Sequence, residues 1–306
     1  MPTSHRMPPS LLSTHERRVN IVVLSTCTPT SVYLIRSLAE RHPISHVFHV
    51  TWGETSTSTS SRLAKFLRAP IRSLVELARR KYFERIHQRR EQQAMAFLPH
   101  SNDSLGDIPT TNIDVSQVNS PAFATQLRQL NPDVLLVSAS PILKPAIFEI
   151  PRLATLNVHR GIAPDYRGER TLFWALYNRD YDHVGVTLHR INRSIDTGAV
   201  LKYGYPALDS HDTEASLTAK SMLLASQMIA DAFDDAPATG LQGARQNGRG
   251  RCFLAREQRF WKEFCYGLAR LFNRRSIPVR LERIVTPKED TSWETREATE
   301  KALAMA

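Results

Sequence analysis

The sequence predicts an α/β protein: a Rossmann-like, mostly parallel sheet flanked by helices, followed by a small C-terminal helical appendage. Short β-branched runs alternate with segments of helical apolar spacing through the first 233 residues. Such alternation builds parallel sheets with right-handed crossovers. A Pro-Ala-Thr-Gly linker then precedes a segment that mixes arginine with aromatic residues. We therefore expect a disordered leader over residues 1–17, a main α/β domain over 18–236 and a basic, partly helical appendage over 237–306.

The composition suits a globular chain without a membrane segment. Hydrophobic residues make up 42% of the 306 positions, which is enough for a buried core. No apolar run approaches the ~20 residues that a membrane-spanning helix needs, and the N-terminus has no hydrophobic stretch of the kind found in secretory signals. The three cysteines have no Cys-x-x-Cys spacing and predict neither a disulfide framework nor a zinc site. We therefore expect no metal and a cytoplasmic location.

The first elements follow directly from the pattern. Val19–Ser25 is a β-branched run that predicts a buried parallel strand. After the turn at Thr26–Pro29, the apolar spacing of Thr30–Arg41 predicts a helix, and Ile44–Thr51 predicts a second strand. Because no Gly-x-Gly-x-x-Gly follows the first strand, a nicotinamide-binding domain is disfavoured.

The net charge of +10 predicts attraction to an anionic partner: nucleic acid, a membrane surface or a phosphorylated substrate. The most basic segment, 62–90, is helix-forming, and Pro70 should begin or kink its helix. The favoured interpretation is a long helix that packs on the sheet and turns its arginines to solvent; the alternative is a surface for a nucleotide diphosphate, RNA or anionic lipid. Its broken apolar stripe consists of Leu63, Phe66, Leu67, Ile71, Leu74, Leu77 and Ile86.

The remaining elements complete the sheet and its cover. Thr110–Val115 predicts a third strand, Pro121–Leu130 a helix, and Asp133–Ser138 the central strand. The amphipathic segment Asp212–Phe233 predicts the helix that closes the main domain. In the appendage, Phe260–Asn273 predicts a helix that docks its aromatic side chains onto the body, with stacking on nucleic-acid bases as the alternative.

Three polar residues are candidates for catalysis. Asn157 and His159 are two apart, so they project from the same side of an extended segment, and the turn-rich loop after them places both at the mouth of a strand. Asp196 lies on an Asp-Thr-Gly turn before another β-like run. An amide that donates to an oxyanion, an imidazole that moves a proton and a carboxylate that orients it suit acyl transfer. Asp196 should also raise the pKa of His159 above its ordinary value.

Five motifs occur in an order that resembles one family. They are Asn-Pro-Asp-Val-Leu-Leu-Val from residue 131, Asn-Val-His, Pro-Asp-Tyr-Arg-Gly, Gly-Val-Thr and Ile-Asp-Thr-Gly. The chain resembles the folate-dependent formyltransferases, which share an Asn-x-His and a later Asp-x-Gly. The resemblance runs from about Val19 to Phe233 and is strongest between Asn131 and Leu201, where these motifs lie. The resemblance implies the formyltransferase fold over the main domain and catalytic roles for Asn157, His159 and Asp196.

The resemblance also implies ligand contacts. The formyl donor would be 10-formyltetrahydrofolate. Arg167 and Arg170 either clamp a phosphate or carboxylate of the substrate or tie their loop to the body. From the residues alone, His189 at the end of Gly-Val-Thr-Leu-His is a candidate secondary polar contact, and Phe173 and Trp174 are expected to begin a helix and to pack in the core. The implied cofactor contacts are Ser140, Ile142, Leu143 and Ile191.

The expected function is an N-formyltransferase that acts on the amine of a small metabolite. The stretch His-Arg-Gly-Ile-Ala-Pro, with Phe-Trp-Ala-Leu downstream, resembles the members that act on nucleotide-linked amino sugars and other secondary metabolites. The acceptor can therefore be phosphorylated, and tRNA is a less favoured partner. The alternatives are methionyl-tRNA formyltransferase, a formyl-folate hydrolase, and a non-catalytic relative that binds RNA or a membrane.

Overall fold

The computed structural model describes residues 19–52, 67, 69–99, 104–248, 250–272 and 277–287. Within these residues the frame is an eight-stranded sheet with the order β10-β8-β7-β5-β4-β1-β2-β3. The pairs between β5 and β3 are parallel, and β7, β8 and β10 continue the sheet in antiparallel pairs. The strands are β1 (Ile21–Ser25), β2 (Ile44–Thr51), β3 (Thr110–Asp114), β4 (Val134–Ser138), β5 (Ala154–His159), β7 (Val186–Arg190), β8 (Val200–Tyr205) and β10 (Arg283–Val285).

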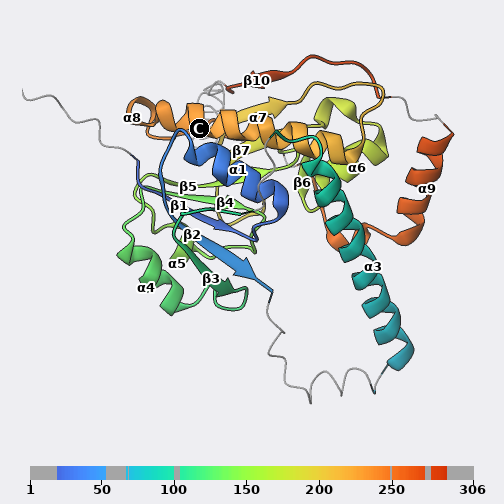
Figure 1. Ribbon diagram of the computed structural model, residues 1–306, viewed down its shortest axis with the longest axis horizontal. Coiled ribbons are helices and arrows are strands. Elements are labelled where there is room, and N and C mark those ends of the chain that lie inside the picture. The colour runs from blue at the N-terminus through green and yellow to red at the C-terminus, as the bar shows by residue number, and fades with distance from the viewer. Residues whose placement is uncertain are drawn as a thin grey trace, which may run out of the picture.

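Helices cover both faces of this sheet (Figure 1). One face carries α1 (Pro29–Ala39) and α7 (Glu214–Asp234), and the other carries α4 (Pro121–Gln129) and α5 (Pro145–Phe148). A separate parallel pair joins β6 (Tyr166–Gly168) to β9 (Arg251–Phe253). The remaining helical segments are α3 (Pro70–Met95), α6 (Thr171–Asn178), η1 (Tyr181–His183), α8 (Ala236–Thr239), η2 (Ala255–Glu257) and α9 (Phe260–Leu271).

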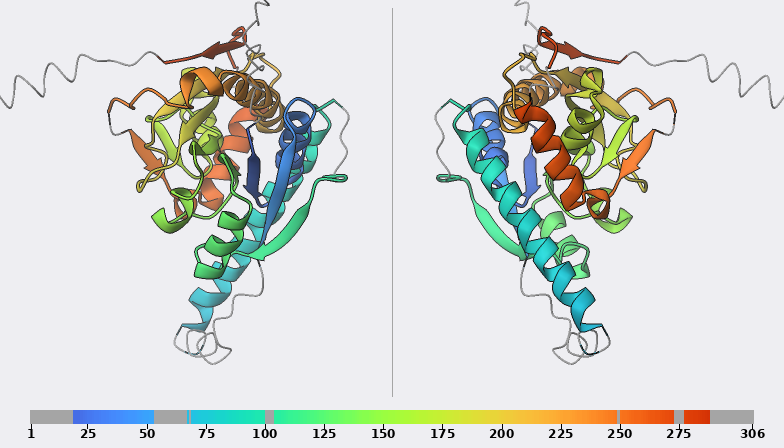
Figure 2. Two further views of the ribbon diagram at one scale, coloured as in Figure 1. Left: turned by 90° about the vertical axis from the view of Figure 1, so that its left-hand side faces the viewer. Right: turned by 90° about the vertical axis from the view of Figure 1, so that its right-hand side faces the viewer.

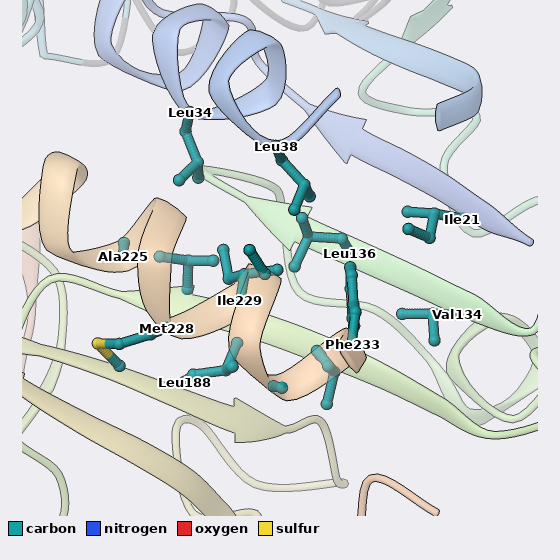
Figure 3. Packing of buried hydrophobic residues seen from close by; sticks show 14 of the residues in the cluster. Ile21, Leu34, Leu38, Val134, Leu136, Leu188, Ala225, Met228, Ile229 and Phe233 are labelled. Carbon is teal, nitrogen blue, oxygen red and sulfur yellow. The ribbon is translucent and has the colours of Figure 1, made fainter. Parts of the chain in front are cut away.

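The central strand shows why the strands of this sheet appear in the sequence as continuous apolar runs and not as alternating apolar and polar residues. In β4, Val134 and Leu136 point into the core under α1 and α7, whereas Leu135 and Val137 point into the core under α4. A strand buried on both faces needs apolar residues at every position. Figure 3 shows the first of these cores, where Leu38 of α1 and residues of α7 meet Leu136. The predicted mostly parallel α/β fold and its order of elements are confirmed.

The long basic helix differs from its expected packing. It begins at Pro70, as predicted, but it packs through its second half, where Phe83 and Ala94 are buried. Ile71 and Leu74 are 78% and 54% exposed, so the expected packing of the apolar stripe is wrong for the first half. The reason is that the body does not reach this half of the helix, where every residue from 74 to 82 is exposed whatever side of the helix it lies on. Figure 2 shows this end of α3 projecting beyond the body; Leu63 and Phe66 lie outside the described residues.

The C-terminal helix is confirmed as α9, but its expected docking is largely wrong. Tyr266 is buried, whereas Phe260, Trp261 and Phe264 are 56%, 67% and 48% exposed. The helix lies beside α3 (Figure 2), and Phe260 contacts Tyr82 there with ring centroids 5.3 Å apart. The short strands β9 and β10 were not predicted, because three residues are too few to show a periodic pattern.

Two further expectations concern the leader and the absence of a membrane-spanning helix. The predicted leader, 1–17, lies outside them. Among the helices that the structure describes, none has both the length and the apolar character to cross a bilayer.

Candidate active site

One cavity of about 620 Å³ opens at the carboxyl ends of β4 and β5. Asn157, His159 and Asp196 all line it, together with residues of α3, α6 and α7. Another hollow, at the start of α3, is lined by Ala69, Pro70, Ile71, Val75 and Glu76, which offer a single titratable group. The first cavity therefore holds the candidate site. Its position agrees with the rule that ligands of open α/β sheets bind outside the carboxyl ends of the strands.

The pairing of β5 with β7 positions the amide. Asn157 lies opposite His189, and its Nδ2 is 3.1 Å from His189 Nε2. His189 Nδ1 lies 2.8 Å from the carbonyl oxygen of Arg190, to which it donates, so Nε2 accepts from Asn157. The second Asn157 N–H points to Asp196 Oδ1 at 3.3 Å. Both amide hydrogens thus have a partner within the site, and one of them must be shared with a substrate oxygen when Asn157 acts as a donor.

The carboxylate of Asp196 connects the other two residues. Its backbone is left-handed, with φ +51°, in the loop between β7 and β8. Oδ2 accepts from the Gly168 N–H at 2.8 Å and lies 3.4 Å from His159 Nδ1. Gly168 has φ +88°, and a Cβ there would lie 2.3 Å from the Phe253 carbonyl oxygen. The glycine of the Tyr-Arg-Gly motif is therefore required both by its conformation and by the close approach of β9.

The protonation states follow from burial and charge. Burial raises the pKa of Asp196, but the neighbouring rings of His159 and His189 and the hydrogen bond from the Gly168 N–H outweigh it and lower this pKa below its usual range. Burial lowers the pKa of His159, and the Asp196 carboxylate opposes this effect without overcoming it. The expectation that Asp196 raises the pKa of His159 above its ordinary value is therefore wrong. Burial destabilises the charged imidazolium more than the single Asp196 carboxylate stabilises it.

The hydrogen bonds of His159 define how it can react. Its Nε2 lies 2.7 Å from the Tyr166 carbonyl oxygen, which can only accept, so Nε2 carries the proton of the neutral ring. Nδ1 is then free to take up a proton, and the resulting imidazolium would face Asp196 Oδ2 at 3.4 Å. Gly161 leaves room for the ring, since a Cβ there would lie 2.8 Å from Nε2.

The residues expected to contact a folate all line the cavity. Leu143 is buried in the core under α4, and Ile191 packs against that core. Ile142 is 70% exposed, and the Ser140 hydroxyl donates to the Pro141 carbonyl oxygen at 3.0 Å. An apolar wall next to a polar cluster fits a flat heteroaromatic ring with a polar edge.

The two candidate arginines have different surroundings. Arg170 lines the cavity, whereas Arg167 is not among its lining residues. Arg167 Nη1 instead donates to the Ile195 carbonyl oxygen at 3.3 Å, which matches the loop-tying alternative. Phe173 and Trp174 begin α6 and are buried, as predicted. In the part of the chain that the structure describes, no group of three His, Cys, Asp or Glu side chains is arranged to hold a metal ion.

The sequence did not reveal a set of charged residues in the same cavity. Arg160 Nη1 pairs with Glu91 Oε1 at 2.7 Å, and Arg90 Nη1 lies 3.0 Å from Glu214 Oε2. Gln246 was also missed: its Nε2 donates to the carbonyl oxygens of Asp196 and Gly198 at 3.0 and 2.8 Å. Their positions in distant segments explain the omission, because only the adjacency of Arg160 to His159 is visible in the sequence.

Known proteins resemble this chain in sequence and in fold. A methionyl-tRNA formyltransferase of Chlorobium luteolum is 35% identical over 130 residues, which are 40% of this chain and 41% of the relative. That of Nitrosomonas eutropha is 31% identical over 140 residues, covering 45% and 44%. The chain thus spans less than half the length of these curated relatives.

Solved structures show the same fold at low identity. A 4-N formyltransferase from Francisella tularensis has a TM-score of 0.50 at 13% identity and covers 78% of this chain and 77% of its own. A Mycobacterium tuberculosis protein described as a candidate sugar N-formyltransferase has a TM-score of 0.50 at 16% identity, with coverages of 81% and 85%. The family model described as formyl transferase matches residues 78–233, which are 156 of the 306 positions. This chain belongs to the formyl transferase family.

Proposed function

We propose that this protein is a cytoplasmic N-formyltransferase that moves a formyl group from 10-formyltetrahydrofolate to the amine of a small metabolite. The observation that carries the proposal is the meeting of Asn157, His159 and Asp196 in one cavity, with His189 behind the amide. Transfer of a formyl group passes through a tetrahedral oxyanion, and these side chains supply a hydrogen-bond donor, a proton acceptor and a fixed negative charge.

Each residue has a distinct role in the proposed mechanism. Asn157 donates to the oxygen of the formyl group, and a donor of this kind contributes about 10²–10³ in rate. His159 accepts the proton that the acceptor amine loses, because its lowered pKa keeps it neutral before reaction. Asp196 then stabilises the imidazolium at His159 and holds the Asn157 amide in place. The folate, when bound, supplies the formyl carbon.

The ligand sites follow from the walls of the cavity. Ser140, Ile142, Leu143 and Ile191 are proposed to contact the folate. The opposite wall carries Arg90, Glu91, Arg160, Arg170 and Glu214 rather than an apolar surface. Their partly paired charges, enclosed in a cavity of about 620 Å³, favour a small polar acceptor.

A second candidate is methionyl-tRNA formyltransferase. The matching relatives carry that name, and α3 turns Arg79, Arg80, Lys81, Arg85 and Arg89 to the surface. Such a face can neutralise phosphates of a nucleic acid, and the exposed Trp261 of α9 can stack on a base.

A transfer assay separates these functions. We expect purified protein with 10-formyltetrahydrofolate to form tetrahydrofolate only when an amine acceptor is added from a panel of amino sugars and other small amines. Formate release without an amine would identify a hydrolase. Formylation of methionyl-tRNA, with acceptor-specific binding that weakens steeply with salt, would identify the second candidate. No turnover with any of these acceptors would contradict the enzyme assignment.

The pH dependence tests the role given to His159. Because His159 must be neutral to accept a proton, activity should fall as pH drops through its pKa, which burial places below the ordinary value of about 6.5. The acid limb of kcat/KM should therefore lie below this value. Asp196 raises the pKa of His159 relative to burial alone, so Asp196→Asn should move the limb to lower pH while it lowers the rate. A profile over about pH 4 to 9 measures both effects, and an unmoved limb in the variant would show that Asp196 does not tune His159.

A further inference from the structure

The cavity crosses the carboxyl edge of the sheet and has two chemically different ends. Leu143 and Ile191 belong to the side under α4 and α5, whereas His87 comes from α3, which packs on α7 on the other side (Figure 1). Asn157 and His159 lie between them on β5. This inference rests on the proposed function, in which the folate binds at the end of the cavity that Leu143 and Ile191 line. The amine acceptor is then left with the end that α3, α6 and α7 form.

The charges at this acceptor end are unevenly paired. Glu91 pairs with Arg160 at 2.7 Å, and its second oxygen accepts from the Thr30 hydroxyl at 2.5 Å. Arg90 lies between two carboxylates, Glu214 at 3.0 Å and Glu263 of α9 at 2.7 Å. Three carboxylates, those of Glu91, Glu214 and Glu263, therefore form ion pairs with only two guanidinium groups, those of Arg160 and Arg90.

Arg170 is the third guanidinium on this wall. Among the residues that the structure describes, no carboxylate forms an ion pair with it, although its side chain lines the cavity. Burial and the like charges of Arg160 and Arg90 outweigh the opposing charges of Glu214 and Glu91 and lower the pKa of Arg170 to about 9. A cation in these surroundings gains more from a bound anion than an exposed arginine does, because little water competes for it.

His87 supplies a second unsatisfied group next to Arg170. Its Nδ1 is buried and has no hydrogen-bond partner within the described ranges, and the ring stacks on Phe83 with centroids 6.2 Å apart. Burial, and then the charges of Arg170, Arg90 and Arg160, lower the pKa of His87 to about 2, so the ring is neutral. A neutral imidazole can donate one hydrogen bond to an anion that a neighbouring arginine neutralises.

We propose that Arg170 and His87 form a subsite for one anionic group, a phosphate or a carboxylate, carried by the amine acceptor. Arg160 pairs with Glu91, and Arg90 pairs with Glu263 and Glu214, which leaves Arg170 as the group that meets the ligand. The acceptor class is then an amine with a negative group at the far end of the cavity from the folate. Neutral amines and simple cationic amines are poor acceptors.

A binding experiment tests this subsite without any turnover. Inorganic phosphate and acetate are titrated into the full-length protein by calorimetry, with Arg170→Gln, Arg170→Lys and His87→Phe as variants. We expect binding of at least one anion, weakened about tenfold or more in Arg170→Gln, less in Arg170→Lys and severalfold in His87→Phe. Arg128→Gln is the matched control, since it removes the same charge from the exposed face of α4, outside the cavity, and should bind as wild type does. The preferred anion distinguishes a phosphate site from a carboxylate site.

Two results would overturn the subsite: equal anion affinity in wild type and Arg170→Gln, or no binding of either anion to wild type. A kinetic arm uses any accepted anionic amine and its uncharged amide or dephosphorylated analogue. Wild type should prefer the anionic form through KM, and Arg170→Gln should lose that preference at similar kcat. Because the binding arm needs no formyl transfer, its failure is distinct from failure of the proposed function.

Discussion

Removal of the Asn157 amide should lower kcat/KM for formyl transfer by about 10²–10³, because it deletes a donor to the oxygen that becomes negative in the transition state. His159→Ala and Asp196→Ala should each cost at least about 10², since one removes the proton acceptor and the other the charge that stabilises it. The three side chains act on one transition state. The double variant of Asn157 and His159 should therefore lose much less than the product of the single effects.

The control is His211→Ala, which removes an exposed histidine that lies outside the cavity. It should keep wild-type turnover, and circular dichroism should show all variants folded. Loss of rate in the variants with unchanged unfolding temperature would assign the effect to chemistry. Wild-type activity in His159→Ala would contradict the proposed mechanism.

The sequence was sufficient for the parts of the site that depend on short-range pattern. Asn157 and His159 share a side of β5 because strand side chains alternate, and this holds whatever the strand packs against. The place of Asp196 next to them did not follow from spacing, since 37 positions separate it from His159. It followed from the order of motifs, and the structure shows the Asp196 carboxylate at 3.3 Å from Asn157 and 3.4 Å from His159.

Properties that depend on the surroundings of a residue in the folded protein could not be predicted from the sequence. The pKa of His159 is set by burial, which no local pattern reports, so a nearby carboxylate alone gave the wrong direction. The stripe of α3 had helical spacing, yet Ile71 and Leu74 face solvent because the first half of the helix extends beyond the body. The pairing of Arg90 with Glu214 and Glu263 joins three helices and depends on how these pack.

The Asp-Thr-Gly turn should be as sensitive as the catalytic carboxylate itself. A Cβ on Gly198 would lie 1.8 Å from the Arg190 carbonyl oxygen and 2.7 Å from its carbon, both of which belong to the backbone. Neither atom can rotate away, so Gly198→Ala must displace the turn between β7 and β8. The Asp196 carboxylate, which reaches Gly168 at 2.8 Å and Asn157 at 3.3 Å, moves with it.

We therefore expect Gly198→Ala to lose about as much activity as Asp196→Ala and to destabilise the fold by about 1–3 kcal/mol, as overpacking of a tight site does. Gly267→Ala in α9 is the matched control. A Cβ there meets nothing within 4 Å, and alanine in a helix interior is favoured by about 0.5–1 kcal/mol, so stability should rise and activity should stay. Chemical denaturation measures the first effect and the transfer assay the second. Wild-type turnover in Gly198→Ala would show that Asp196 need not hold this position, and the role proposed for its carboxylate would fall with it.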